Sequence, residues 1–224
     1  TNVLCLNGVA GNYASAPDSA ATSITGDIDL QAYVSLNDWT PASANYVIGK
    51  WNTAGQRSYR FYVAIGGALG LLTSADGTAN SSNDVSTVAN SFTDYSPGWI
   101  RVTRASASGQ CIFYTGGTSS TPTWVQLGAT VAGTAGAIFN GTDSVELGSI
   151  VGGTTSILSG NIYRAQIYNG IAGTLVFDAN FATASKLAPS FTESSSNAAT
   201  VTINTSGATG ARISGARDLV QMTA

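Results

Sequence analysis

Residues 58–75 read Ser-Tyr-Arg-Phe-Tyr-Val-Ala-Ile-Gly-Gly-Ala-Leu-Gly-Leu-Leu-Thr-Ser-Ala. Every second side chain from 61 to 65 is a large hydrophobe, and the alternation restarts at Leu69. A period of two places one face of a strand on a core, and Gly66-Gly67 supplies the positive φ angles of a tight turn. The stretch therefore predicts an antiparallel hairpin with one buried face and one solvated face, the latter formed by Arg60, Tyr62 and Ala64.

The same alternation recurs along the chain, and no segment shows a convincing helical period. It is longest at 27–36, where five apolar residues share one parity and the polar residues take the other. We expect residues 76–91 to form a loop or a weak edge. Further strands are expected at residues 45–52, 99–103, 110–115, 123–127, 144–150, 160–168 and 174–181. Many short strands without helices predict an all-β fold, an antiparallel two-sheet β-sandwich or jelly roll.

The last segment, residues 182–224, differs in its sequence pattern from the rest of the chain. Residues 192–199 are typical of a mobile loop, and short β-like runs follow at 200–204 and 211–223. The sequence leaves two placements open: the segment adds strands to the sandwich formed by residues 1–181, or it forms an arm that pairs with a neighbouring chain. We slightly favour the arm, because the preceding strands already complete a sandwich.

Composition excludes two classes of partner. The 224 residues carry a formal net charge of −3, and only 9% are charged against a typical value of about 25%. Nucleic-acid binding needs clustered Lys and Arg, which are scattered here. The longest nearly apolar run, 61–72, is too short to span a bilayer and is broken by glycines. We therefore expect neither nucleic acid nor membrane insertion.

The absence of histidine removes the commonest general base and the usual serine and cysteine protease arrangements. Glycoside hydrolysis would need two carboxyl groups across a cleft. Asp27 and Asp29 come nearest, but they flank a strand start where solvated carboxylates are ordinary, and Glu146 has no acid partner in register. We predict that the chain is not an enzyme.

Calcium is the cofactor that the sequence leaves open. Asp76, Asn80, Asn83 and Asp84 crowd one polar loop, and hard cations take such oxygen ligands. Against this, turns prefer the same residue types, and no spacing matches an EF-hand.

The two cysteines, Cys5 and Cys111, lie in strand-like runs. Buried thiols packing as small hydrophobes are the favoured interpretation, and a disulfide stays open.

Aromatic residues are the other candidates for binding. Strand parity places Tyr62 and Trp99 on outer faces, with Trp51, Tyr33 and Trp124 as further candidates, and sugars stack on such rings. We predict a ligand-binding cluster of Trp51, Tyr62 and Trp99 on one face. Outward aromatics serve subunit interfaces equally well, so the sequence leaves both uses open.

Five segments carry a family resemblance. They are Asp-Ile-Asp-Leu-Gln-Ala-Tyr-Val (27–34), Val-Ile-Gly-Lys-Trp-Asn (47–52), Ser-Tyr-Arg-Phe (58–61), Trp-Ile-Arg-Val-Thr (99–103) and Gly-Asn-Ile-Tyr-Arg-Ala-Gln-Ile-Tyr-Asn-Gly (160–170). Together they resemble the laminin G-like branch of the concanavalin A-like sandwiches, over roughly residues 1–181. The last segment resembles the family's penultimate strand, in which Ile162, Ala165 and Ile167 would face the core across a small bulge.

Within that family the chain is similar to domains of tailed-phage virion proteins: tail fibres, minor tail proteins and capsid appendages. The resemblance implies a structural protein on the virion surface, made in the host cytoplasm. Its implied partners are other virion proteins, further copies of itself in an oligomer, and surface glycans bound weakly. The alternative is a stand-alone carbohydrate-binding, lectin-like module. The paired acids of the glucanase branch are missing.

Overall fold

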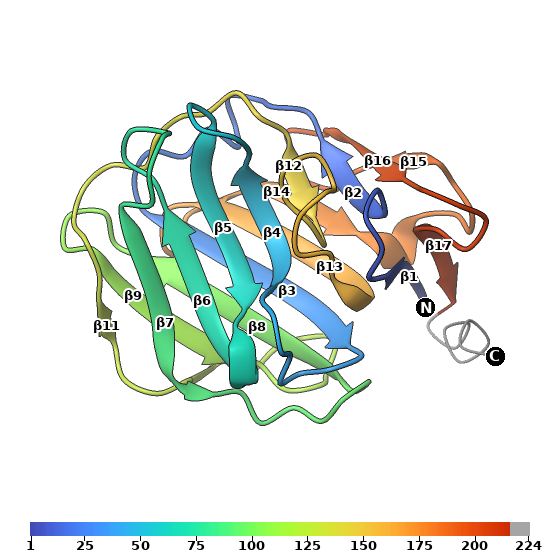
Figure 1. Ribbon diagram of the computed structural model, residues 1–224, viewed down its shortest axis with the longest axis horizontal. Helices are drawn as coiled ribbons and strands as arrows, with labels where there is room; N and C mark the ends of the chain where they lie inside the picture. Colours follow the sequence, from blue (N-terminus) through green and yellow to red (C-terminus); the bar gives the residue numbers. More distant parts are fainter. Residues whose placement is uncertain (216–224) are drawn as a thin grey trace.

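The computed structural model describes residues 1–215 and places their strands in two antiparallel sheets packed face to face (Figure 1). Sheet A contains β1 (Asn2–Asn7), β3 (Ile28–Leu36), β8 (Pro97–Arg104), β9 (Gln110–Thr115), β10 (Val125–Gln126), β11 (Val131–Ala132), β13 (Ser159–Asn169), β14 (Thr174–Asn180) and β17 (Arg212–Gly215). Sheet B contains β2 (Tyr13–Ala16), β4 (Asn45–Trp51), β5 (Arg57–Val63), β6 (Ala68–Thr73), β7 (Ser82–Ala89), β12 (Val145–Leu147), β15 (Ser190–Thr192) and β16 (Thr200–Asn204).

The predicted all-β sandwich is confirmed. Strand β3 lies between β8 and β13 in sheet A, and its alternate residues enter the core between the sheets without solvent exposure: Ile28, Leu30, Ala32, Val34 and Leu36. The order of sheet B ends at β7, so the polar stretch 76–91 contains an edge strand, as expected. No helix of the described residues is long and apolar enough to cross a membrane.

The hairpin of residues 58–75 forms from β5 and β6, joined by a 3-10 turn at Ile65–Gly67. Gly66 and Gly67 have φ angles of 72° and 90° there, as the sequence predicts. The prediction of a solvated outer face is wrong for β5, because Tyr62 packs in a second apolar cluster outside the main core. Its ring lies across Gly70, where an added Cβ would stand 2.2 Å from the ring.

The described part of residues 182–224 adds strands to both sheets of the sandwich. Strand β16 pairs with β2, and β15 pairs with β16. Strand β17 pairs with β1 at the border of sheet A. The sequence left two placements open for this segment. In the structure its described strands are added to the sandwich of their own chain. The remainder of the run 211–223, from residue 216 on, lies outside the described residues.

The two cysteines face opposite sides of sheet A, which prevents a disulfide between them. The Sγ atom of Cys5 lies 3.0 Å from Ser214 Oγ, whereas Cys111 packs in the main core with its Sγ 3.3 Å from Asp84 Oδ2. Burial raises the pKa of the Cys111 thiol, and the nearby Asp84 carboxylate raises it further. Both thiols are buried, in agreement with the favoured interpretation.

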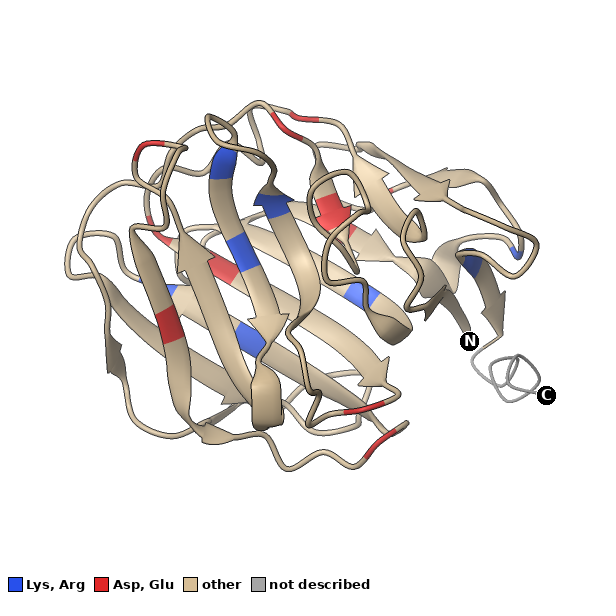
Figure 2. Ribbon diagram, viewed as in Figure 1, with Lys and Arg blue, Asp and Glu red and all other residues tan. Residues whose placement is uncertain are grey.

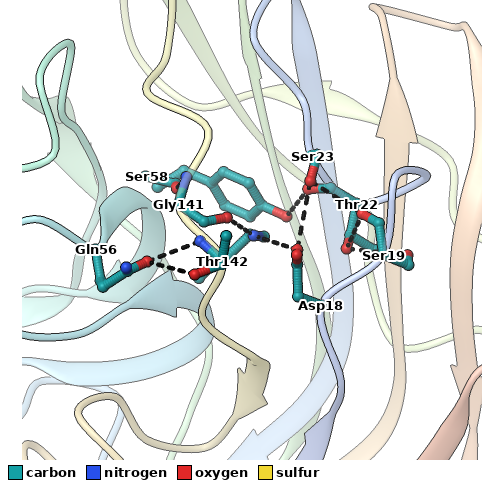
Figure 3. A network of polar contacts seen from close by, with 10 residues as sticks. Asp18, Ser19, Thr22, Ser23, Gln56, Ser58, Gly141 and Thr142 are labelled. Atoms are coloured by element: carbon teal, nitrogen blue, oxygen red, sulfur yellow. Dashed lines mark hydrogen bonds and ion pairs between the residues drawn. The ribbon is translucent and has the colours of Figure 1, made fainter.

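A buried lysine joins three segments of the chain. Lys50 on β4 is fully buried, and its Nζ donates to Asp18 Oδ1 at 2.6 Å and to the carbonyl oxygen of Gly141. Figure 3 shows these two acceptors facing each other across the network, with Ser58 beside Gly141. The backbone N–H of Gly141 donates to Ser58 Oγ at 3.0 Å. The network therefore connects β4 to the loops that precede β3 and β12.

Candidate functional site

Four aromatic rings form a continuous row on the outer face of sheet A. Tyr163 lies 4.7 Å from Tyr33 between ring centroids, Tyr33 stacks on Trp99 at 5.2 Å, and Trp99 meets Trp124 edge-on at 5.9 Å. These four residues are called the aromatic row below. They come from β13, β3, β8 and the segment before β10, so four separate parts of the sequence contribute one ring each.

Strand register explains why the rings meet. Tyr33 on β3 lies directly opposite Trp99 on β8. The register between β13 and β3 shifts between Ile162 and Arg164. A bulge of this kind inserts one extra residue in one strand, so Tyr163 and Arg164 both reach the outer face, while Ile162 stays in the core. The bulge that the family resemblance implies is therefore what brings Tyr163 to the row.

The row has a buried support and three accessible rings. Trp99 is only 2% exposed, and its indole N–H donates to the carbonyl oxygen of Ser119 at 2.8 Å. Tyr33, Tyr163 and Trp124 are each partly exposed. The hydroxyl group of Tyr33 donates to the Thr118 carbonyl oxygen at 2.7 Å. The three partly exposed rings, and not Trp99, can contact a ligand.

An immobilised guanidinium borders the row. Arg101 donates from Nε to Asp29 Oδ1 at 2.9 Å and from Nη2 to Asp29 Oδ2 at 2.7 Å. Gln31 Nε2 donates to the same carboxylate. The Arg101 guanidinium also lies 4.9 Å from the ring centroid of Tyr114 and 5.5 Å from that of Trp124. Planar polar groups thus stand beside accessible rings, an arrangement that can bind a ligand with an apolar face and hydroxyl groups at its edge.

The acidic residues that sequence analysis considered for catalysis have structural partners instead. Asp29 is buried in its pair with Arg101, so the expectation of a solvated carboxylate is wrong there. Asp27 Oδ1 accepts from the Ser106 backbone N–H at 2.7 Å and from its hydroxyl at 2.8 Å, and these bonds lower the pKa of Asp27. Glu146 is buried, which raises its pKa, and it accepts from the backbone N–H groups of Gly152 and Gly153.

The three predicted ligand-binding aromatics do not form one exposed cluster, so this part of the prediction is wrong. Trp51 and Tyr62 lie in sheet B and Trp99 in sheet A. Trp51 is 3% exposed and Tyr62 6%. Both pack with Leu72 and with Ile150 of the segment that follows β12. Parity assigned their faces correctly, but side chains from other strands and a loop cover them.

The predicted calcium ligands do not lie together in the structure either. Asn83 and Asp84 are neighbours on β7 and point to opposite faces: Asn83 Oδ1 accepts from the Tyr62 hydroxyl at 2.7 Å, whereas Asp84 is buried and accepts from Ser82. Asp76 and Asn80 lie in the exposed turn before β7. Within residues 1–215 no group of three or more Asp, Glu, Cys or His side chains is placed to hold a metal ion. The four residues therefore do not form one site.

Asp76 offers a test of this assignment. Its Oδ1 accepts from the backbone N–H groups of Thr78 at 2.7 Å and Ala79 at 3.1 Å, and these bonds lower the Asp76 pKa from 3.8 to about 2. Because the folded pKa lies below the ordinary one, the carboxylate contributes stability above pH 3.8 that is lost as the pH falls through about 2. Carboxyl carbon NMR should show this midpoint, unchanged by millimolar calcium. A midpoint near 3.8 would contradict the turn assignment, and a calcium-dependent midpoint would support a calcium ligand.

Sequence reasoning missed Tyr163 and Tyr114. Tyr114 alternates with the core residues Cys111 and Phe113 on β9, so parity alone would have placed it outside. Alternation counted from Ile162 puts Tyr163 on the outer face, but alternation counted back from Ala165 puts it on the core face, so parity alone does not place it.

Comparison with known proteins shows similarity in structure alone. No family model and no curated sequence matches the chain. A proposed carbohydrate-binding protein from Bacteroides ovatus superposes with a TM-score of 0.62 at 11% identity, over 96% of this chain and 59% of that one. The CBM40 of the Ruminococcus gnavus IT-sialidase, bound to α2,3-sialyllactose, gives 0.53 at 14% identity, over 75% and 91%. The leech intramolecular trans-sialidase, complexed with 2,7-anhydro-Neu5Ac, gives 0.51 at 14% identity, over 77% and 27%.

These likenesses confirm the fold that the sequence resemblance implies, an antiparallel two-sheet sandwich of the jelly-roll, lectin-like type. This chain corresponds to just under three fifths of the Bacteroides ovatus protein and to nearly the whole CBM40. At such identities a shared fold carries no activity with it.

Proposed function

We propose that the chain is a carbohydrate-binding module whose binding surface is the aromatic row on sheet A. The observation that carries the proposal is the row itself: two partly exposed tyrosines on one side of a buried tryptophan and a partly exposed tryptophan on its other side, next to the guanidinium of Arg101. Pyranose rings have an apolar face that stacks on aromatic rings, and their hydroxyl groups take hydrogen bonds from planar donors. Two structural neighbours, the proposed carbohydrate-binding protein from Bacteroides ovatus and the CBM40 bound to sialyllactose, support this use of the fold.

The biological setting that we propose is the surface of a tailed-phage particle, on the tail or the capsid. The support is the resemblance of the strand segments to virion domains and the low content of charged residues. Mass spectrometry of intact particles from the source is the test. Detection of this chain supports the virion role, and its absence from purified particles favours a stand-alone lectin-like module.

We also propose a non-enzymatic, oligomeric protein. Asp27, Asp29 and Glu146 each accept hydrogen bonds within the fold, which argues against their use as an acid and base pair. Light scattering tests the oligomer, and a strictly monomeric chain would contradict that part of the proposal.

Trp124→Ala tests the binding surface. Stacking on an aromatic face contributes about 0.5–1.5 kcal/mol beyond burial, and 1.4 kcal/mol corresponds to tenfold. We therefore expect roughly two- to tenfold weaker binding to the glycans that a glycan array identifies, measured by calorimetry. Tyr95→Ala is the matched control, because Tyr95 is 72% exposed and outside the row. An array without hits, or equal losses in both variants, would contradict the proposal.

A further inference from the structure

Two arginines on β5 form no ion pair with an acidic residue of the described part of the chain. The ion pairs among the described residues use Lys50, Arg101 and Arg164 as their cations. Arg57 and Arg60 take part in none of them. Figure 2 shows the basic positions of β5 on the sheet that faces the viewer, sheet B, on the opposite side of the sandwich from the aromatic row.

The guanidinium of Arg60 is held by rings. Its Cζ atom lies 4.3 Å from the centroid of Trp51 and 4.7 Å from that of Tyr46. Stacking uses the faces of the guanidinium and leaves its N–H groups, which lie in its plane, as the groups that can donate. The Nε atom of Arg60 is buried and has no hydrogen-bond partner among the described residues.

Arg57 adds a second positive charge at the same place. Its Cζ atom lies 5.7 Å from the centroid of Trp51, and its Nη1 donates to the Thr78 carbonyl oxygen at 2.6 Å. Its Nε is buried and likewise lacks a partner within residues 1–215. Burial is the main cause that lowers the pKa of Arg60, and Arg57 lowers it further. Two partly buried like charges without a counter-ion favour the arrival of an anion.

We infer that Arg57 and Arg60 form a binding site for a carboxylate group, and that its ligand is an acidic sugar of the uronic acid type. A carboxylate is planar and accepts two parallel hydrogen bonds from one guanidinium, and Arg60 is oriented by two rings before any ligand arrives. The carboxylate part of the inference rests on the arginines alone. The sugar part rests on the proposed carbohydrate-binding function.

Titration with D-glucuronate, followed by the NMR signals of the arginine Nε–H groups, tests the inference. We expect glucuronate to shift the Arg60 signal while neutral D-glucose at the same concentration does not. Arg60→Met keeps an unbranched side chain against the rings and should weaken glucuronate binding at least tenfold. Arg57→Met should weaken it severalfold. Arg212→Met, a partly exposed arginine of sheet A, is the matched control and should bind as the parent does.

The outcomes separate this inference from the proposed function. Trp124→Ala should leave glucuronate binding unchanged, so the carboxylate part of the inference stands even where the aromatic row fails. An Arg60 signal that glucuronate does not move, or equal affinity in parent and Arg60→Met, would overturn the carboxylate site. Acetate or triglutamate binding as tightly as glucuronate would overturn the assignment to a sugar.

Discussion

Asp18→Ala is expected to lower the free energy of unfolding by about 3 kcal/mol, although Asp18 is the more exposed partner of its ion pair. The Asp18 side chain is 30% exposed and that of Lys50 only 1%. Removing Asp18 leaves a buried ammonium group whose remaining acceptor is the Gly141 carbonyl oxygen. Breaking a buried pair by deleting one partner typically costs about 3–5 kcal/mol, and the partial exposure of Asp18 places this case at the lower end.

Urea unfolding followed by tryptophan fluorescence measures this effect. Lys50→Met should cost less than Asp18→Ala, because the carboxylate that it leaves behind reaches solvent. The double variant should resemble Lys50→Met. Ser23→Ala is the control, since it removes the 3.3 Å hydrogen bond to the same carboxylate oxygen and the 3.0 Å bond to the Ser19 carbonyl oxygen but leaves the ion pair intact, and a single hydrogen bond contributes about 1 kcal/mol. A larger loss of unfolding free energy in Lys50→Met than in Asp18→Ala would contradict the burial of this pair, in which Lys50 is the more buried partner.

Trp99→Ala is expected to destabilise the protein by about 3–5 kcal/mol, the usual cost of deleting a buried tryptophan ring. Trp99 supports Tyr33 on one side and Trp124 on the other, so its loss should also disorder the candidate binding surface. Trp124→Ala removes a partly exposed ring and should cost about 1 kcal/mol or less. Comparing the two variants thus distinguishes a ring that supports its neighbours, Trp99, from a ring that can contact a ligand, Trp124.

Chemical denaturation of both variants provides the measurement, and Trp99→Phe provides the control. Phenylalanine keeps an aromatic ring against Tyr33 but loses the hydrogen bond to Ser119, so it should recover most of the stability. If Trp99→Ala cost no more than Trp124→Ala, Trp99 would be an exposed ligand-contacting residue, as the sequence alone predicts, and not the support of the row.

Local alternation predicted the fold well because a period of two depends only on neighbours in the chain. Strand β3 follows from it, and the turn at Gly66-Gly67 follows from the positive φ angles that glycine allows, whereas the bulge before Ala165 follows from the family resemblance. The same rule would have shown that Asn83 and Asp84, adjacent in a strand, point to opposite faces. The polar composition of residues 76–91 hides β7, so the sequence does not show that the rule holds there.

Depth of burial could not be predicted in the same way. Parity correctly placed Tyr62 and Trp51 on an outer face, but it carries no information about what covers that face. The cover comes from Ile150, some ninety residues further along the chain, and from Tyr46 and Leu72 on neighbouring strands. The partner of Asp29 is likewise distant in sequence, since Arg101 lies on the adjacent strand β8.

The order of residues along the chain was thus sufficient to determine that this protein is a two-sheet sandwich and which side of each sheet most strands present to the core. Pairing of strands far apart in sequence decided the rest: which outward rings form an accessible row, which are covered, and which charges meet a partner. The physical reason is that alternation is a property of one strand, whereas exposure and electrostatic pairing depend on side chains that only the register between strands and the path of the loops bring together.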